Sequence, residues 1–164
     1  MDTTSRQINF HSGEFRQILG TFATGVTVVT ACSKTGELAG LTINSFTSVS
    51  LDPPLILWCL ANSSDNLELF QTTKRFAVNI LAADQKDISL HFAKRQKDKF
   101  DYLPYRTGLD GNPLLENCVS WLQCRTVAQY VAGDHTVFIG EVEQIESSGK
   151  DALLYHQGEY TTIK

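Results

Sequence analysis

The sequence predicts a mainly β chain, folded as a closed antiparallel barrel with a few short helices. Most of its apolar segments are short, rich in β-branched residues and bounded by glycine, proline or Ser/Thr-rich turns, which is typical of strands. Apolar residues recur at helical spacing in only a few places. Many strands with few helices favour a closed barrel.

Length, composition and charge restrict the possible classes of protein. The 164 residues are enough for one domain with a sizeable core, and 42% hydrophobic residues argue against disorder. A net charge of −4 and a pI near 5.5 argue against a general nucleic-acid binder. No apolar run approaches the roughly 20 residues of a membrane span, and residues 1–10 lack the apolar core of a signal peptide. We therefore expect a single cytoplasmic domain over residues 1–164, with residues 1–11 as a flexible N-terminal arm.

The first expected elements are a helix and two strands. Residues 12–23 predict the helix, capped by Ser12, because four apolar side chains recur on one face: Phe15, Ile18, Leu19 and Phe22. Residues 26–31 are rich in β-branched residues and predict a strand. A turn at 33–36 then returns the chain along residues 38–50, which we expect to be the hairpin partner of that strand.

Residues 40–57 are the most distinctive part of the sequence. Their first half carries hydroxyl and amide side chains among apolar residues: Thr42, Asn44, Ser45, Thr47, Ser48 and Ser50. Asp52-Pro53-Pro54 predicts a sharp turn, and the apolar run 55–60 that follows predicts a buried strand. Buried polar groups need hydrogen-bond partners. The hydroxyls therefore either bond to the backbone of a twisted barrel strand or form a wall that binds a flat, polar, uncharged ligand.

Residues 62–66 follow the apolar strand and are expected to open a short helix. Asp65 with Glu68 resembles a capping box. Ser63, Ser64 and the free backbone N–H groups at such a helix start can bind an anion. The alternative is ordinary capping, which the two carboxylates favour because they repel phosphate.

A second buried strand, over residues 76–81, leads to another helix. Asp84 is the expected cap of this helix, and Ile88 and Phe92 share one face. Four cations follow at its C-terminal end: Lys94, Arg95, Lys97 and Lys99. They either complement the helix dipole or attract the phosphates of a nucleotide.

The remaining chain is expected to be a loop and two hairpins. Residues 102–111 are rich in turn-forming residues and predict a mobile loop. Residues 120–131 and 136–146 predict two long strands, and 153–155 with 159–163 predict a last hairpin around Gln157-Gly158.

Common catalytic and metal-binding motifs are missing from the sequence. Its four cysteines form no Cys-x-x-Cys pair and have no histidine at zinc-finger spacing, so we expect no metal site: Cys32, Cys59, Cys118 and Cys124. There is no Gly-x-Gly-x-x-Gly motif, no phosphate loop ending in Gly-Lys-Ser/Thr and no Gly-x-Ser-x-Gly elbow. The polar wall, the possible anion site and the cations suit a reaction whose chemistry comes from bound cofactors.

Several segments resemble, in order and spacing, the short-chain flavin reductases, whose flavin-reductase-like split barrels serve as reductase components of two-component flavin monooxygenases. The polar stretch 40–57 resembles their flavin-binding signature. The other matching pieces are Ala23–Thr30, Asn62-Ser63-Ser64, His91-Phe92-Ala93 with Lys99-Phe100, Gly133-Asp134-His135 and Leu154–Tyr160. The likeness covers about Phe15 to Ile163.

The resemblance implies a split β-barrel: mainly β, antiparallel, of Greek-key type, with a few short helices. It implies that FMN or FAD binds, that NADH or NADPH donates a hydride, and that the chain forms a homodimer. By position, the residues expected at the cofactor are Thr42, Ile43, Asn44, Ser45, Ser48, Cys59, Ala61, Asn62, Ser63, Ser64, Asn66, Phe92, Lys99, Phe100, Gly133, Asp134, His135 and Tyr160.

His135 is the candidate catalytic residue. In the family a histidine of this kind lies on the nicotinamide side of the site, where it orients the carboxamide or shields the rings. Hydride transfer needs no general base, so we assign His135 no proton-transfer role. The alternative is a loop histidine that bonds to the backbone.

The expected function is an NAD(P)H:flavin oxidoreductase that releases reduced flavin to a separate monooxygenase. A flavin carrier that uses no nicotinamide, and a barrel that binds another flat ligand without catalysis, are the alternatives. Pyridoxamine-phosphate oxidase activity on a similar barrel lacks support, because the strands carry no dense Arg and Lys phosphate motif. Neither nucleic acid nor membrane is an expected partner.

Overall fold

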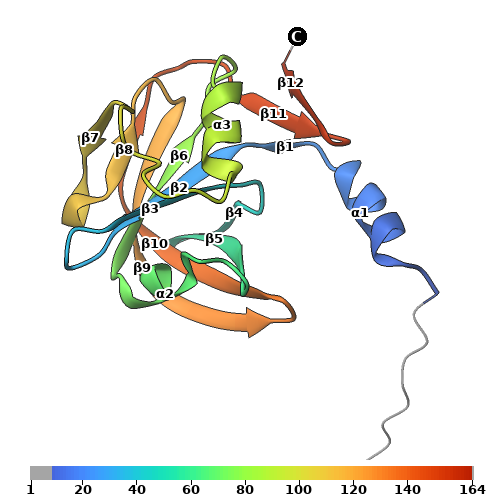
Figure 1. The fold of residues 1–164 in the computed structure, drawn as a ribbon, viewed down its shortest axis with the longest axis horizontal. Helices are drawn as coiled ribbons and strands as arrows, with labels where there is room; N and C mark the ends of the chain where they lie inside the picture. The colour runs from blue at the N-terminus through green and yellow to red at the C-terminus, as the bar shows by residue number, and fades with distance from the viewer. Residues whose placement is uncertain (1–8, 164) are drawn as a thin grey trace, which may run out of the picture.

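The computed structural model describes residues 9–163. Within these residues the helices are α1 (Ser12–Gly20), α2 (Leu67–Thr72), α3 (Lys86–Ala93) and the short 3-10 helix η1 (Leu109–Gly111). The strands are β1 (Thr24–Gly25), β2 (Thr27–Cys32), β3 (Leu38–Ile43), β4 (Thr47–Leu51), β5 (Pro54–Ala61), β6 (Arg75–Ile80), β7 (Tyr105–Thr107), β8 (Pro113–Leu115), β9 (Ser120–Ala132), β10 (His135–Ser147), β11 (Leu153–His156) and β12 (Glu159–Thr162). This mainly β architecture with few helices confirms the predicted fold class (Figure 1).

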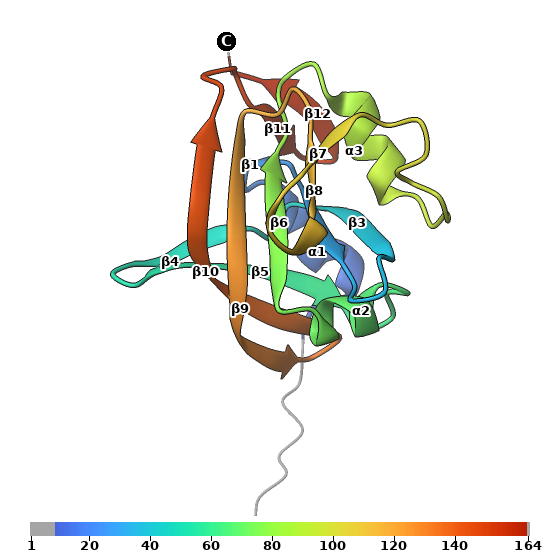
Figure 2. The same cartoon turned by 90° about the vertical axis from the view of Figure 1, so that its left-hand side faces the viewer.

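A seven-stranded antiparallel sheet of order β3-β2-β6-β9-β10-β5-β4 curls into the barrel (Figure 2). β3 and β4 lie at opposite edges of this sheet although they are consecutive in the chain. The single strand predicted over 38–50 is therefore wrong, because the chain leaves β2 after Ile43 and begins to pair with β5 only at Thr47. Residues 44–46 run from one edge of the sheet to the other.

The core consists of two apolar clusters on the two faces of β2 and β6. Inside the barrel, Trp58 stacks on Phe138 with ring centroids 4.6 Å apart, and Phe70 and Phe76 meet it edge-on. The second cluster lies under α3 and contains the buried side chain of Phe92. β2 and β6 are buried on both faces because each contributes to both clusters, which explains their near-continuous apolar sequences.

His11, and not the predicted Ser12, caps α1. Its backbone is extended, and its ring Nδ1 accepts hydrogen bonds from the N–H groups of Gly13 and Glu14 at 3.1 and 3.3 Å. The Glu14 carboxylate in turn accepts from the His11 N–H at 3.0 Å, which completes a capping box. The prediction was wrong by one position because an imidazole performs the role usually taken by a hydroxyl or carboxylate.

The predicted caps of α2 and α3 are also wrong. α2 begins after Asn66, so Asp65 and Glu68 do not have the spacing of a capping box about this residue. α3 begins after Gln85, one residue beyond Asp84. Neither Asn66 nor Gln85 makes a side-chain cap bond, so tertiary packing positions these helix starts.

Residues 102–111 form ordered structure instead of the predicted mobile loop. β7 in this segment pairs with β8, and the Asn112 side chain next to it is buried and accepts a hydrogen bond from the Cys32 N–H at 2.8 Å. The Leu115 N–H donates to the buried Asn79 side chain at 2.8 Å. Turn-forming residues identified the bends correctly, but long-range side-chain bonds hold the segment against β2 and β6.

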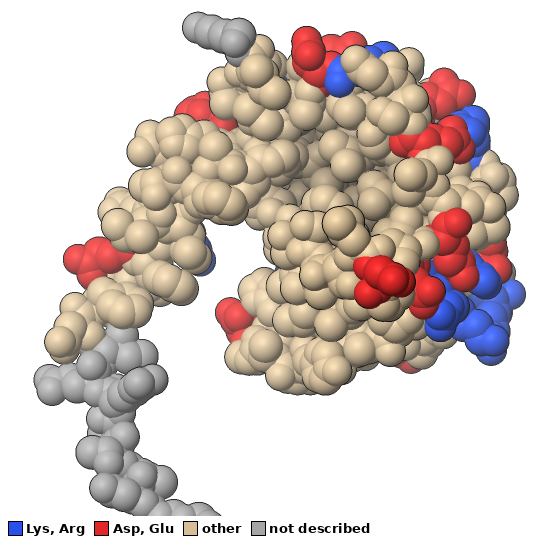
Figure 3. Space-filling model, turned by 180° about the vertical axis from the view of Figure 1, so that it is seen from behind, with Lys and Arg blue, Asp and Glu red and all other residues tan. Residues whose placement is uncertain are grey.

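The amphipathic helix α1 is the one α-helix of the described residues with no buried residue. Its predicted apolar face lies open, with Ile18 69% and Phe22 77% exposed. Figure 3 shows a hollow with few charged side chains between α1 and the barrel. The predicted flexible arm falls mainly on residues 1–8, which lie outside the described residues. No helix among residues 9–163 is both long enough and apolar enough to cross a bilayer.

Candidate functional site

One large cavity, of about 1140 Å³, lies beside the outer edge of β3. The end of β5 and the turn before α2 form one wall, and the loop after α3 forms the opposite wall. Most of the residues predicted to bind the cofactor line it: Thr42, Ile43, Asn44, Ser45, Cys59, Ala61, Ser63, Ser64, Asn66, Phe92, Lys99, Phe100 and His135. Residues up to 93 positions apart in the chain, from Thr42 to His135, therefore meet at one site.

Asn62, Gly133 and Asp134 do not line the cavity but form the support beneath His135. The Asn62 N–H donates to the Asp134 carbonyl at 2.8 Å, and its side-chain amide donates to the Gly133 carbonyl at 3.3 Å. Thr136 donates its hydroxyl to the Asn62 side-chain oxygen at 2.7 Å. These bonds fasten the β9–β10 turn to the end of β5.

Ser48 and Tyr160, also predicted at the cofactor, lie elsewhere. Ser48 is exposed on β4, on the far side of residues 44–46 from β3. Tyr160 packs on Tyr155 with ring centroids 5.2 Å apart, and its hydroxyl is 2.8 Å from that of Ser89 on α3. Tyr160 thus supports α3 from the side of β12.

The outer edge of β3 is tightly packed against aromatic rings at Gly40. A Cβ atom at this position would lie 2.6 Å from Phe92 and 2.8 Å from Phe100, so only glycine fits without movement. The two rings meet edge-on at 5.2 Å. Gly40 was not among the predicted site residues, although a glycine inside a strand pattern is a known signal of close backbone approach.

Lys99 clamps the end of α3 to this edge. Its ammonium group donates to the carbonyls of Gly40 and Phe92 at 3.0 and 2.9 Å. Partial burial lowers the pKa of Lys99. The Gly40 carbonyl, which accepts from Lys99, points away from β2. Every second residue of an antiparallel edge strand directs its backbone groups the same way. The backbone N–H and C=O of Thr42 therefore also point outward, toward the cavity.

The hydroxyls of Thr42 and Ser45 in the polar wall already form hydrogen bonds with other groups of the chain. Thr42 donates its hydroxyl to the Ser89 carbonyl at 2.6 Å, which joins β3 to α3. Ser45 donates to the Cys59 carbonyl at 3.2 Å and accepts from the Cys59 N–H at 3.0 Å. Ser45 therefore bridges the crossing segment to β5, across the opening of the barrel. For a ligand, these two hydroxyls offer only acceptor lone pairs.

Cations face the turn that carries Ser63 and Ser64 (the serine turn) across the cavity. Arg95 reaches from the loop after α3 to the Ser63 carbonyl, 3.4 Å away. Ser64 accepts a hydrogen bond from the Asn66 N–H at 3.3 Å. None of the ion pairs among residues 9–163 involves a cation of this loop: Lys94, Arg95, Lys97 and Lys99. The carboxylates of Glu37, Asp65, Asp98 and Asp101 also line the cavity, so four carboxylates match the four loop cations in number.

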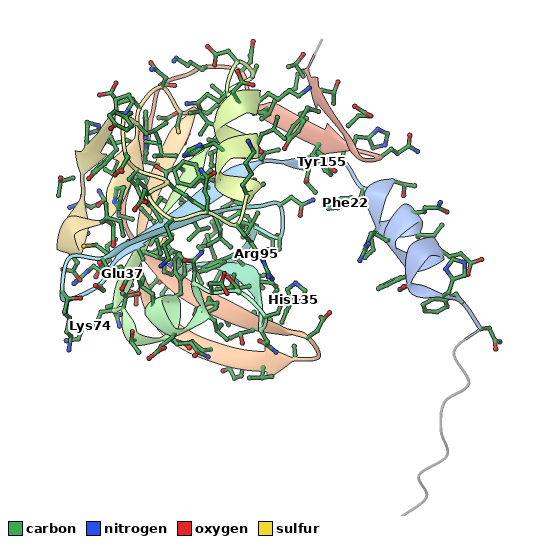
Figure 4. The ribbon with its side chains drawn as sticks, in the orientation of Figure 1. Phe22, Glu37, Lys74, Arg95, His135 and Tyr155 are labelled. Carbon is green, nitrogen blue, oxygen red and sulfur yellow. The ribbon has the colours of Figure 1, made fainter. Side chains whose placement is uncertain are left out.

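His135 begins β10 directly opposite Ala61 of β5, and its side chain is 46% exposed. Its Nδ1 is 2.7 Å from the Asp134 carboxylate, and this bond lowers the pKa of Asp134. An ionised carboxylate can only accept, so Nδ1 carries a hydrogen and the neutral ring exposes Nε2 as an acceptor. In Figure 4, Arg95 and His135 lie on the same side of the barrel, between α3 and the β9–β10 turn. No cluster of three or more potential metal ligands occurs in the described part of the chain.

Comparison with known proteins identifies relatives over most of the chain. The model of the flavin reductase like domain family matches residues 19–164. A probable flavin reductase of Rhizobium meliloti is 46% identical over 153 residues, which are 93% of this chain and 49% of that protein. FMN reductase (NADH) SmoA of Agrobacterium fabrum is 41% identical over 150 residues, 92% of this chain and 85% of its own.

A solved structure has the same fold. The NADH:FAD oxidoreductase SgcE6 of Streptomyces globisporus, in complex with NAD and FAD fragments, superimposes with a TM-score of 0.88 at 36% identity and covers 93% of this chain and 92% of its own. The chain spans about half the length of two of the curated relatives that it matches. The family match, the identities and the shared fold together show that this chain belongs to the flavin reductase like domain family.

Proposed function

We propose that this chain is a flavin reductase that transfers a hydride from NADH to FMN or FAD. The observation that carries the proposal is the cavity, which joins a strand edge of uncharged hydrogen-bonding groups to a serine turn faced by cations. Relatives named FMN reductase (NADH) and NADH-dependent flavin reductase favour NADH over NADPH.

The residues that line the cavity fit a flavin nucleotide. The volume of about 1140 Å³ exceeds that of a typical pocket for one drug-sized ligand, roughly 300–1,000 Å³, so a second ring can enter beside the flavin. A bound flavin supplies a hydride acceptor at N5, and reduced nicotinamide supplies the hydride from C4. The task of the chain is then to bind the two rings face to face, orient them and exclude water.

The outer edge of β3 supplies the ring contacts in this proposal. The ring edge of a flavin carries carbonyl oxygens, which need donors, and one N–H, which needs an acceptor. Since the hydroxyl hydrogens of Thr42 and Ser45 are engaged, backbone N–H groups such as that of Thr42 and the amide of Asn44 are the available donors. The lone pairs of the same hydroxyls are available as acceptors for the N–H.

The serine turn and the loop after α3 supply the phosphate contacts. Ser63 and Ser64 offer their hydroxyls, while the Ser64 N–H is engaged with the Ala61 carbonyl at 2.9 Å, and Arg95 and Lys99 offer charge. Two of the three ammonium hydrogens of Lys99 are engaged, which leaves one for a ligand. Charge-assisted bonds of this kind suit phosphate oxygens. Asp65 opposes an anion here, so we place the phosphate toward Arg95.

His135 takes the nicotinamide side of the cavity, opposite the loop cations. We expect His135→Ala to raise the apparent KM for NADH more than that for flavin, because the exposed Nε2 acceptor is lost while the polar wall stays intact. Steady-state kinetics with each substrate varied in turn measures the two effects. Equal increases in both KM values would indicate that His135 supports only the β9–β10 turn.

The decisive experiment follows the loss of NADH or NADPH absorbance with FMN and FAD in turn. Rapid oxidation of NADH that requires added flavin is the expected result. Flavin binding by fluorescence quenching without oxidation would favour the carrier, and absence of both would refute the proposal. Reduced flavin then passes to a separate monooxygenase. The relative named as the reductase component of the flavin-dependent trigonelline monooxygenase of Acinetobacter baylyi supports this step. Reduced nicotinamide is an intracellular metabolite, which supports a cytoplasmic location for the chain.

We also propose a homodimer, with the apolar face of α1 against a second copy. The side chains of this face are open, and Leu51 at the end of β4 is 94% exposed. Exposed apolar patches of this kind mark interaction sites. Ile18→Asp should shift the chain toward monomer in light scattering, whereas Gln17→Asp, which adds the same charge on the same helix, should not. A wild-type monomer at micromolar concentration would contradict the proposal.

A further inference from the structure

His91 lies on α3, beside the loop after this helix that carries Lys94, Arg95, Lys97 and Lys99 (the cation loop). It contacts both ends of a short turn in this loop, residues 96–99. Its Nε2 is 2.6 Å from the Lys99 carbonyl, and because a carbonyl only accepts, Nε2 carries the hydrogen. Its Nδ1 is 3.3 Å from the side-chain nitrogen of Gln96, which donates. A neutral ring with its hydrogen on Nε2 therefore satisfies both contacts. The ring also packs edge-on against Phe92 at 5.2 Å.

The turn that His91 holds has a strained backbone and carries the cations. Asp98 has a φ of 61°, in the left-handed region that a residue with a side chain adopts only when its surroundings impose it. Lys99 follows directly, and its ammonium group bonds to Gly40 and Phe92 as described above. Arg95 precedes the turn and reaches Ser63. The backbone conformation of residues 96–99 thus determines where the side chains of Arg95 and Lys99 lie at the cavity.

Few other contacts hold this turn. Residues 94–98 are exposed, and in the described residues their side chains form no ion pair. The bond from His91 to the Lys99 carbonyl ties the end of the turn to α3, and the contact with Gln96 ties its beginning. Without the ring, the Lys99 carbonyl and the Gln96 amide would turn to water. The left-handed Asp98 would then keep the bond from the Asp101 N–H to its carbonyl, at 3.1 Å, but would lose the two contacts that flank it.

We propose that His91 is a positioning residue, which acts through the turn 96–99 to hold Arg95 and Lys99 where they bind the phosphate of a flavin nucleotide. The inference rests on the proposed function, because it assigns the cation loop to that ligand. The expected consequence is specific: removing the two bonds of His91 weakens binding of a phosphorylated flavin and spares binding of the unphosphorylated ring.

Two variants separate the hydrogen bonds of His91 from its packing. His91→Phe keeps an aromatic ring against Phe92 but removes both nitrogens. His91→Gln places an amide donor near the position of Nε2 and should restore the bond to the Lys99 carbonyl. Fluorescence quenching gives the dissociation constants of FMN and of riboflavin, which shares the ring and ribityl chain but lacks the phosphate.

We expect His91→Phe to weaken FMN binding about three- to tenfold, the effect of losing roughly one hydrogen bond, and to change riboflavin binding less than twofold. His91→Gln should recover most of the loss. Equal weakening for FMN and riboflavin, or unchanged FMN binding, would overturn the inference. If His91→Phe fails to fold, Gln96→Leu removes only the exposed partner of His91 and should weaken FMN binding by a smaller factor while sparing riboflavin binding. A Gln96→Leu variant with no loss specific to FMN would also overturn the inference. Wild-type protein that quenches neither flavin would refute the proposed function itself.

Discussion

Gly40→Ala tests the close packing between β3 and the rings that cover it. The new Cβ would lie 2.6 Å from a ring atom of Phe92, about 0.8 Å short of ordinary contact at 3.4 Å, and 2.8 Å from Phe100. Both are ring atoms of packed aromatic side chains, which cannot swing away as a flexible chain end can. Overpacking of this kind costs about 1–3 kcal/mol, and the lower backbone entropy of alanine in the unfolded chain offsets about 0.5–1 kcal/mol. We expect a net loss of about 1–2 kcal/mol.

Thermal unfolding followed by circular dichroism measures this effect. For a chain of this size, 1 kcal/mol corresponds to about 2–4 °C in Tm, so Gly40→Ala should lower Tm by about 2–8 °C. Flavin binding should weaken as well, since α3 and Phe100 move away from the edge that lines the cavity. Gly25→Ala is the matched control, because nothing lies within 4 Å of its Cβ. Equal Tm values for the two variants would refute the packing argument at Gly40.

Two further predictions concern single side chains. Ser45→Asp should abolish flavin binding, because it places a charge on the cavity wall and a carboxylate opposite the Cys59 carbonyl. Ser45→Thr keeps the hydroxyl and should still bind flavin. Unchanged flavin affinity of the aspartate variant would remove Ser45 from the site. Arg75 donates to Glu143 at 2.6 Å and lowers the pKa of that carboxyl below 4.5. A lowered pKa stabilises the fold above pH 4.5 and loses this effect as the pH falls through the folded value. Arg75→Gln should therefore destabilise the protein near neutral pH in urea titrations, and the difference from wild type should shrink toward pH 3. A constant difference would contradict the assigned pair.

Local sequence patterns identified most of the secondary structure. β2, β6, β9, β10 and the β11–β12 hairpin lie within one or two residues of their predicted bounds, because each has a clear apolar pattern between turn residues. The patterns failed where a contact distant in the chain decides the outcome. Asn112 and Asn79 order the segment predicted as a loop, and His11 caps a helix that was assigned to a neighbouring serine.

The family resemblance selected residues that line the cavity, but not the contacts that each one makes. Ser45 and Thr42 were read as ligand-binding hydroxyls, yet their hydrogens bond to β5 and α3. Asn62 was read as a ligand residue and instead fastens the turn beneath His135. A hydroxyl or amide in a sequence shows only that a donor exists, and its partner is known only once the fold brings one within reach.

By itself, the sequence determined a mainly β chain, the positions of its turns and the polar stretch beside the cavity. Those features depend on side-chain periodicity and on the dihedral preferences of proline and glycine, which act within a few residues. Only the tertiary structure decided that residues 38–50 break into two strands at opposite edges of one sheet, and that β3, the serine turn, the cation loop and His135 enclose one cavity. The reason is physical: the pairing of a strand depends on which edge is free when the barrel closes, and no local pattern records that choice.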